Sequence, residues 1–481
     1  MVFPATLAVY LLFPTHNYYW DGVAFALHIE HPDWFGESMV TPNHLVYVPF
    51  GRAVYVGLNR LGVAAPALAT LQGINSLAGA ASVALLCRVL LGLTQSGSLS
   101  LFLSLLFAFS ATWWKFATDA NAYVISVLFL LIAFALATRA GQPASARAAL
   151  AHTAAMLFHQ LAVFFFPVAL LGLFTARGKS QWRAAAIYSL LAAALTLGAY
   201  SAGYMVKHGE WDLAGFLGWI TYHTPDSSFS FDFGRNLLAT LRGHLRLFLG
   251  GKVSLFRDFT STAAAALAVA ASLAFIALWP RISSAASEAG GERKRTAIMA
   301  VAWAGVYVVF LFFWLPQNTF YRLFYLPALV VLAALIPEWR PGRRSAALLA
   351  AGILWNFLFF VHPHSRVESN LPLQFALSMR KDWPKGSIIY LGSFHADAWL
   401  MWYLHPQTIW KVVGAGDLRG LENELRAVYA QGGKAWADTS LVTTLAAEPA
   451  GRNWLAAHTL TGAERAQGRI QFVQLFPAAA P

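Results

Sequence analysis

Long apolar runs recur along this chain and set the strongest limit on how it can fold. A helix that crosses a bilayer needs about 20 predominantly apolar residues, and most of the runs have close to that length. They occupy residues 2–13, 66–92, 97–114, 122–138, 148–176, 183–206, 261–279, 297–315, 322–337 and 345–361. If 148–176 is a hairpin that turns at His159 and Gln160, the sequence predicts a polytopic α-helical membrane bundle of about eleven spans over residues 1–361.

The composition agrees with a membrane protein, because 58% of the residues are hydrophobic and only 12% are charged. A formal net charge of +12 would indicate nucleic-acid binding in a soluble protein. Here Lys and Arg recur in short connectors between apolar runs, where they mark the cytoplasmic side. We therefore interpret the charge as a topology signal and expect no nucleic-acid partner. Cys87 is the only cysteine, which excludes an intramolecular disulfide.

The first apolar run, 2–13, has no basic residues before it and no convincing cleavage site, so it does not resemble a signal peptide. We interpret it as the outer part of a first helix that can begin upstream of Met1. Alternation of the spans then places a first loop, 14–65, and a second large loop, 207–260, on the non-cytoplasmic face. We expect a bacterial inner-membrane protein whose active site faces the periplasm.

After residue 361 the pattern changes from long apolar runs to short strand-like segments. These are "KGSIIYLG", "QTIWKVVG", "GKAWADT" and "GRIQFVQLF", and helical segments such as "DLRGLENELRAVYAQ" lie between them. Strands that alternate with helices indicate an α/β domain. The sequence predicts a small soluble α/β domain over 362–481, on the same non-cytoplasmic face as the two large loops.

The first loop contains a carboxylate in an aromatic setting, within "HNYYWDGVAFALHIEHPD". Asp21 follows Tyr19 and Trp20 just past the first apolar run, and Tyr and Trp favour the membrane interface. A partly buried carboxylate there can act as a general base. The alternative is that Asp21 caps the helix that begins at "GVAFALHI".

The same loop has histidines and acids that could bind a metal ion, because imidazole and carboxylate are common ligands of zinc and manganese. No tight ligand spacing such as HExxH is present. We favour polar loop residues that face water and predict no metal, although a divalent ion stays the alternative. The candidate ligands are His28, Glu30, His31, Asp33, Glu37 and His44.

Arginines on the non-cytoplasmic side run against the usual charge distribution of membrane proteins. Arg322 begins the run in "PQNTFYRLFYLP", and it can either snorkel at the interface or hold a phosphate with its planar fork. Arg235, Arg242 and Arg246 can share one face of an amphipathic helix whose other face is rich in leucine. Such a helix lies at the interface, where its arginines either anchor it or contact anionic lipid.

Two turns on this face add further polar residues. "TWWKFATDANAY" brings Lys115, Asp119 and Asn121 to one turn, and "FHQ" brings His159 and Gln160 to another. Each residue alone is typical of a solvated or capped helix end. Their convergence on one face of the membrane favours a site there.

The order of these motifs resembles that of the membrane protein O-mannosyltransferase-like family of GT-C glycosyltransferases. In that family an Asp-Ser-Gly-Glu element precedes a His-Pro-Pro-Gly-Tyr-Pro-Leu-Tyr stretch, a Gly-Arg pair and an Asn-Leu-Leu-Ser-Ala run. The parallels here are "WDG", "PNHLVYVPFGR" and "INSLAGA". "AFSATWWKFATDANAYVISVLFLLIAF", "HQLAVFFFP" and "FYRLFYLPAL" resemble later hairpins of the family. The resemblance covers most of 14–176 and 317–337.

The resemblance implies roles for the residues already described. It makes Asp21 the base that activates an acceptor hydroxyl and Arg322 a ligand of the donor phosphate, with Arg242, Arg246 and Lys115 as further phosphate or lipid ligands. It also implies a sugar and acceptor pocket formed by Tyr19, Trp20, His44, Asp119, Asn121, His159, Gln160 and Tyr321.

The sequence departs from the family pattern at two places. The residues after Asp21 are Gly22, Val23 and Ala24 rather than Ser-Gly-Glu, and Asn121 stands where the family has a glutamate. An altered acceptor or a weak activity would be compatible with these changes.

The resemblance therefore implies an inverting glycosyltransferase that moves a hexose or pentose from a polyprenyl phosphate to a hydroxyl of a protein, glycan or lipid, without a cofactor. A transporter or flippase of a lipid-linked sugar is the main alternative. Transporters tend to have internal repeats and ionisable residues near the bilayer midplane, and neither is evident here. The third possibility is a membrane scaffold without catalytic activity.

Overall fold

The computed structural model describes residues 2–32, 39–138, 144–175, 181–221, 229–279, 290–336, 340–393, 396–414 and 418–478. The chain divides into two compact units. A helical unit comprises Met1–Thr15 and His28–Ser365, and a second unit comprises His16–Leu27 and Arg366–Pro481. The second unit thus joins a short segment of the predicted first loop to the C-terminal part of the chain.

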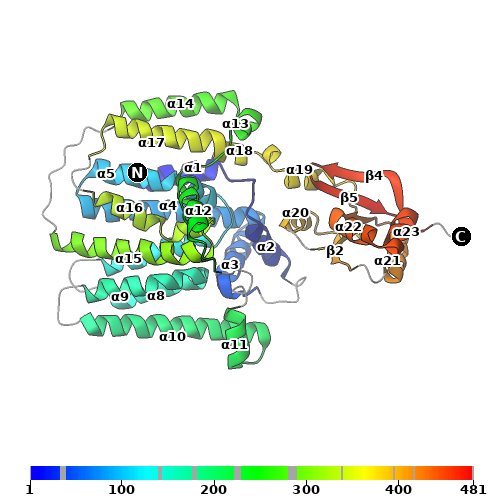
Figure 1. Ribbon diagram of the computed structural model, residues 1–481, viewed down its shortest axis with the longest axis horizontal. Helices are drawn as coiled ribbons and strands as arrows, with labels where there is room; N and C mark the ends of the chain where they lie inside the picture. Colours follow the sequence, from blue (N-terminus) through cyan, green and yellow to red (C-terminus); the bar gives the residue numbers. More distant parts are fainter. Residues whose placement is uncertain are drawn as a thin grey trace. The chain divides into compact units, whose positions relative to one another are not determined.

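Many helices of the helical unit run side by side (Figure 1). Among these, α7 packs against α8, α8 packs against α10, and α4 contacts α1, α5 and α7. They are α1 (Val2–Leu12), α4 (Ala67–Thr94), α5 (Gly97–Ala108), α7 (Tyr123–Ala137), α8 (Ser145–Phe158), α9 (Phe166–Phe174), α10 (Gln181–His208), α14 (Thr262–Ala277), α15 (Gly290–Trp314), α16 (Leu326–Ala334) and α17 (Arg343–Asn356).

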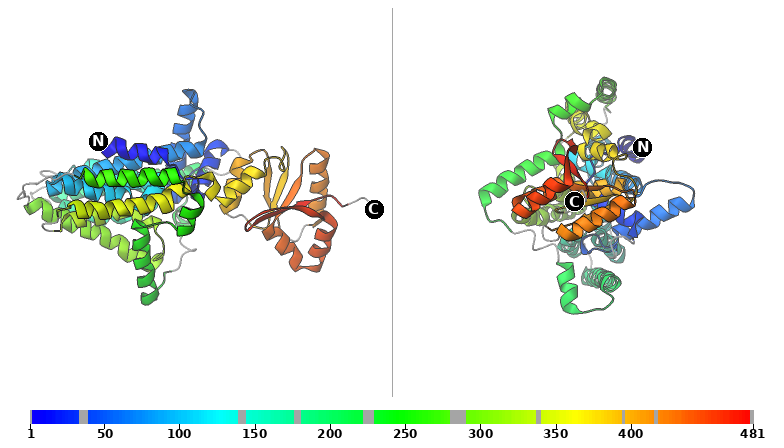
Figure 2. Two further views of the ribbon diagram at one scale, coloured as in Figure 1. Left: turned by 90° about the horizontal axis from the view of Figure 1, so that it is seen from above. Right: turned by 90° about the vertical axis from the view of Figure 1, so that its right-hand side faces the viewer.

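Further elements connect these helices, and α3 and α12 run across them (Figure 2). The bundle therefore has cross-helices near the ends of the helices that run side by side. The further elements are α3 (Tyr47–Arg60), α6 (Ala111–Ala117), α11 (Leu213–Ile220), α12 (Phe233–Phe248), α13 (Val253–Phe259), α18 (His362–His364), the 3₁₀ helices η2 (Pro42–His44), η3 (Gln160–Phe165) and η4 (Phe320–Phe324), and the π-helix η5 (Phe357–Val361).

Four described helices are long and apolar enough to cross a membrane: Ala67–Thr94, Gln181–His208, Arg293–Trp314 and Arg343–His364. A fifth span results if Gly97–Ala108 and Ala111–Ala117, which bend by 67°, count together. Shorter apolar helices accompany them, for example Tyr123–Ala137 and Thr262–Ala277. The predicted apolar helical bundle is confirmed, and the count of about eleven spans stays a prediction.

The cross-helix α12 is amphipathic, as its sequence predicts. Asp232 caps its first turn by accepting a hydrogen bond from the Arg235 backbone N–H at 3.0 Å. The buried side of α12 includes Asn236, Thr240, Gly243 and Leu247, whereas its other leucines are exposed, among them Leu238 at 71% and Leu245 at 62%. Exposed leucines on a helix of a membrane protein are suited to contact lipid.

The second unit contains a five-stranded sheet with the strand order β2-β1-β3-β5-β4. Strand β1 runs parallel to β2 and β3, while β5 is antiparallel to β3 and β4. The strands are β1 (Ile388–Leu391), β2 (Ile409–Val412), β3 (Ala435–Asp438), β4 (Thr459–Gln467) and β5 (Ile470–Leu475). The small C-terminal sheet domain is thereby confirmed, and β4 is an additional strand that the sequence pattern did not predict.

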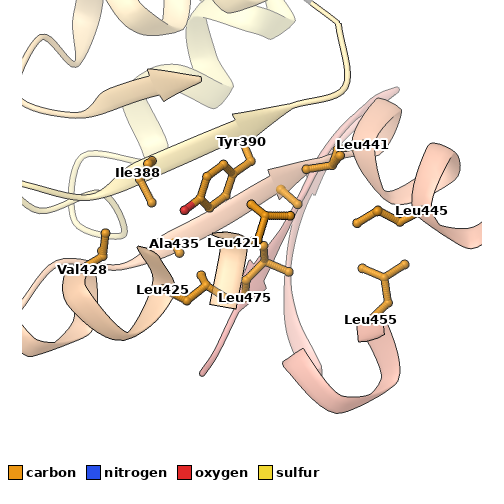
Figure 3. Packing of buried hydrophobic residues seen from close by; sticks show 11 residues of the cluster. Ile388, Tyr390, Leu421, Leu425, Val428, Ala435, Leu441, Leu445, Leu455 and Leu475 are labelled. Atoms are coloured by element: carbon orange, nitrogen blue, oxygen red, sulfur yellow. The ribbon is translucent and has the colours of Figure 1, made fainter. Parts of the chain in front are cut away.

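Alternate residues of the strands pack on opposite faces of the sheet, because successive side chains of a strand point to opposite sides. Ile388 and Tyr390 belong to one core cluster, with Leu421 and Leu425 of α21 (Figure 3). Ile389 and Leu391 belong to the other, with Trp383. The helices of this unit are α19 (Leu371–Ser378), α20 (Ala396–Leu404), α21 (Leu418–Ala430), α22 (Thr439–Ala447) and α23 (Pro449–His458), preceded by the 3₁₀ helix η6 (Val367–Ser369).

The first part of α2 (Trp20–Glu30) packs within this second unit. Val23 is buried in a cluster with Leu373 of α19 and Leu400 of α20. The Asn370 side-chain amide donates a hydrogen bond to the His16 carbonyl at 2.7 Å. The sequence analysis treated this stretch as part of a loop of the membrane domain, whereas its packing places it with the C-terminal segment.

Candidate active site

Arg322 is a buried cation in the helical unit. It lies in the 3₁₀ helix η4, and only 1% of its side-chain surface is exposed. Its Nη1 donates to the Tyr325 hydroxyl at 2.7 Å, and its Nη2 donates to the Pro316 carbonyl at 2.6 Å. Tyr325 follows Arg322 by one 3₁₀ turn, so the short helix aligns the two side chains.

His244 of α12 extends this cluster. Its Nδ1 lies 2.9 Å from the Thr240 carbonyl, and its Nε2 lies 3.0 Å from the Tyr325 hydroxyl. We assign the proton to Nδ1, because the Tyr325 hydroxyl can then donate to Nε2 while accepting from Arg322. Burial lowers the pKa of His244, the hydrogen bond with the Thr240 carbonyl opposes part of this shift, and the Arg322 charge adds to it, which agrees with a neutral imidazole.

All hydrogen-bond partners of Arg322 are uncharged. Among the described residues no carboxylate pairs with its guanidinium, and its Nε has no hydrogen-bond partner there. A buried charge is costly unless an opposite charge and hydrogen bonds compensate it. The cluster is therefore suited to receive an anion.

The other predicted phosphate ligands lie on elements that pack together with η4. Helix α6, which carries Lys115, contacts both η4 and α12, and α12 carries Arg242 and Arg246. Both arginines are exposed. Lys115 already forms an ion pair with the buried Asp119. Its charge is thus compensated within the protein, and its role as a phosphate ligand stays a prediction.

Several predicted pocket residues meet around Tyr123, a residue that the sequence analysis did not single out. The rings of His159, Tyr321 and His44 have centroids 4.9, 5.8 and 6.2 Å from that of Tyr123. The His44 and His159 rings are themselves 4.8 Å apart. Aromatic rings with exposed or movable edges can contact a sugar, but here they pack primarily on one another.

Two other predicted pocket residues have structural hydrogen bonds. The Asn121 side-chain oxygen accepts from the backbone N–H groups of Tyr123 and Val124 at 3.1 and 3.2 Å, so Asn121 caps the start of α7. Its amide donates to the Phe116 carbonyl at 2.6 Å. Gln160 donates to the Ile220 carbonyl at 3.0 Å. A contact of either residue with a sugar stays a prediction.

Asp21 lies in the second unit, in the first turn of α2 with Tyr19 and Trp20 directly before it. Burial raises the pKa of the Asp21 carboxyl to about 6, and a hydrogen bond with the Tyr19 side chain opposes part of this shift. A carboxylate with a pKa near neutrality is suited to take and release protons. Trp20 is half exposed.

The predicted metal-ligand set does not form a cluster where it is described. Asp33 and Glu37 lie outside the described residues. Glu30 accepts a hydrogen bond from the Ala67 backbone N–H at 2.6 Å, which fixes the start of α4. Among the described residues, no three His, Cys, Asp or Glu side chains are grouped to hold a metal ion.

The helical bundle with a small C-terminal sheet domain is the fold that the GT-C resemblance implies, and two solved structures of ArnT from Cupriavidus metallidurans are similar to it. The one bound to undecaprenyl phosphate has a TM-score of 0.60 and 14% sequence identity, and the match covers 98% of this chain and 97% of that chain. The apo structure has a TM-score of 0.61 and 14% identity, with 98% and 96% covered. The chain matches no protein-family model and no curated protein sequence.

Proposed function

We propose that this protein is an integral membrane glycosyltransferase that uses a sugar linked to a polyprenyl phosphate. The GT-C fold over nearly the whole chain supports this class of enzyme, since ArnT, the neighbour in fold, binds undecaprenyl phosphate. The observation that carries the proposal is the buried Arg322, which has neutral partners and an unpaired Nε among the described residues. The acceptor hydroxyl and the active site would face the non-cytoplasmic side, in a bacterial cell the periplasm.

Arg322 would bind the phosphate of the donor. Tyr325 and the Pro316 carbonyl orient its guanidinium, and its charge, which no described carboxylate neutralises, would attract a phosphate oxygen. Charge grows on the phosphate as the glycosidic bond breaks, and a preorganised cation stabilises that charge most in the transition state. The exposed Arg242 and Arg246 would contact the phosphate or neighbouring anionic lipid.

Asp21 would act as the general base. Its carboxylate takes the proton of the acceptor hydroxyl, and the oxygen attacks the anomeric carbon on the side opposite the phosphate. The bond from the anomeric carbon to the phosphate oxygen breaks, and the polyprenyl phosphate leaves with the electron pair. Configuration at the anomeric carbon inverts. The raised pKa of Asp21, about 6, leaves it ionised at neutral pH and basic enough to assist.

The test uses purified full-length protein, radiolabelled polyprenyl-phosphate sugars and membrane extracts as acceptors. We expect label to move to an acceptor with the wild type and the loss of that transfer with Asp21→Asn and Arg322→Gln. Asp258→Asn, which changes an exposed acid, is the matched control. Movement of the labelled lipid between leaflets without loss of its sugar would instead favour a transporter. The donor that reacts would also identify the sugar that is transferred.

A further inference from the structure

The second unit contains a cavity of about 320 Å³, and both segments of the unit, His16–Leu27 and Arg366–Pro481, contribute residues to its lining. Helix α2 and the residues just before it form one wall, and η6, the start of α19 and the start of α20 form the other. The lining residues are Asn17, Tyr18, Trp20, Val23, Ser369, Asn370, Leu371, Pro372, Asp397 and Leu400.

The cavity combines aromatic rings with one carboxylate, Asp397, that has no hydrogen-bond or ion-pair partner among the described residues. Tyr18 and Trp20 line it, and Trp20 is half exposed. The Asp397 side chain makes no hydrogen bond or ion pair with another residue in the described part of the chain. Asn370, by contrast, is already occupied, because its amide group bonds the His16 carbonyl and the Leu373 backbone N–H. Asp397 is therefore an acceptor that a ligand can use.

This combination fits a sugar ring. The hydroxyl groups at the edge of a sugar are hydrogen-bond donors, and an ionised carboxylate is an acceptor only. The C–H face of the ring is apolar and can lie against an aromatic side chain, as apolar ligand faces do in most small-molecule sites. The volume is at the lower end of the range of about 300–1,000 Å³ for such sites, which suits one or two sugar rings.

The cavity is also next to the proposed base in the chain. Asp21 lies between the lining residues Trp20 and Val23, in the same helical turn of α2. A ligand held against Trp20 would thus lie beside the turn that carries the Asp21 carboxylate. We propose that this cavity binds a sugar ring of the acceptor and that the acceptor is therefore a glycan. The role of the bound sugar as acceptor rests on the proposed transferase function, whereas the binding of a sugar to the cavity does not depend on it.

Binding can be measured without donor or turnover, by titration calorimetry and saturation-transfer NMR of the full-length protein in detergent with neutral disaccharides such as chitobiose, lactose and maltose. We expect at least one of the disaccharides to bind. Trp20→Ala and Asp397→Asn should each raise its Kd at least about tenfold, because each variant removes one contact, aromatic or polar, with the sugar. Trp211→Ala is the matched control, because Trp211 is as exposed as Trp20, at 50%, but belongs to the helical unit.

Three results would overturn the glycan proposal: no disaccharide binds, binding is unchanged in both cavity variants, or spermidine binds there and the sugars do not. The last result would identify a site for organic cations, which a carboxylate with aromatic rings can also hold. Disaccharide binding that depends on Trp20 and Asp397, without any sugar transfer, would support the cavity and contradict the proposed function. The two proposals can thus fail separately.

Discussion

Gly243 of α12 lies directly against the guanidinium of Arg322. A Cβ atom at position 243 would be 2.5 Å from both Nε and Nη2 of Arg322, which is closer than atoms can approach. The absence of a side chain at Gly243 therefore lets the cross-helix approach the buried cation, and it brings His244 into reach of Tyr325.

Gly243→Ala should displace Arg322 and weaken donor binding. The added methyl group contacts the guanidinium itself, so we expect the donor KM to rise about tenfold or more with a smaller change in kcat. Gly57→Ala is the control, since a Cβ at Gly57 of α3 meets no atom within 4 Å. An unchanged donor KM in Gly243→Ala would show that Arg322 does not contact the donor.

Tyr325→Phe should also weaken donor binding. It removes the oxygen that accepts from Arg322 and donates to His244, so both side chains lose an orienting hydrogen bond. Such a bond contributes about 0.5–1.5 kcal/mol, which corresponds to a rise in donor KM of about two- to tenfold. Tyr188→Phe removes a similar hydrogen bond to His152 elsewhere in the bundle and serves as the control. Equal donor KM values for Tyr325→Phe and Tyr188→Phe would contradict the role of the Tyr325 hydroxyl in orienting Arg322 and His244.

The activity should fall as the pH decreases through about 6, because Asp21 must be ionised to act as a base. Asp21→Asn should reduce kcat/KM by about 10²–10⁴-fold at pH 8, the usual contribution of a general base. A pH profile of kcat/KM for the wild type, measured with saturating acceptor, checks the first expectation. An Asp21→Asn variant with wild-type kcat/KM would eliminate Asp21 as the base.

The raised pKa of the Asp21 carboxyl also predicts in which direction its substitution changes the stability of the fold. Its pKa in the folded protein, about 6, is above its ordinary value of 3.8, so the folded state binds a proton more tightly than the unfolded chain. Ionisation of Asp21 thus lowers the free energy of unfolding as the pH rises from about 4 to about 6, and the free energy stays lowered above pH 6. Asp21→Asn should raise the Tm at pH 8 and leave it unchanged at pH 4. A lower Tm at pH 8 would mean that the loss of activity reflects damage to the fold.

Asn121→Ala should destabilise the protein rather than only inactivate it. Loss of a helix cap costs about 1–2 kcal/mol, and the Phe116 carbonyl also loses its 2.6 Å hydrogen bond from Asn121. Thermal unfolding in detergent, followed by circular dichroism, measures the effect. Asn59→Ala, which removes an exposed hydrogen bond to the Tyr55 carbonyl, is the control. A normal Tm with lost transfer would instead support a direct role of Asn121 in the pocket.

The apolar runs predict the helical bundle well, because burial in lipid demands them wherever a helix crosses the membrane. The C-terminal strands are equally visible as short β-branched and aromatic segments, except β4. That strand is "TLTGAERAQ", which has too few β-forming residues to be recognised and is held by pairing with β5.

The site is less visible in the sequence. The Lys115–Asp119 pair has the spacing of four residues that favours an ion pair in a helix, so it could have been predicted. His244 could have been noticed as the single histidine of an arginine- and leucine-rich helix. Tyr123 and Tyr325 could not, because their importance depends on contacts between elements far apart in the chain.

The pairing of residues 16–27 with the C-terminal segment has a consequence for how the protein is made. The hydrogen bond between Asn370 and His16 joins residues 354 positions apart, and Val23 has its buried partners on α19 and α20. During synthesis this segment emerges near the beginning, while its partners are translated near the end. The second unit can therefore complete its core only after most of the bundle has been inserted, and a release or stalling of translation before residue 366 would leave Val23 and the proposed base without their native surroundings. Any exchange of C-terminal domains between related proteins would need to transfer both segments together.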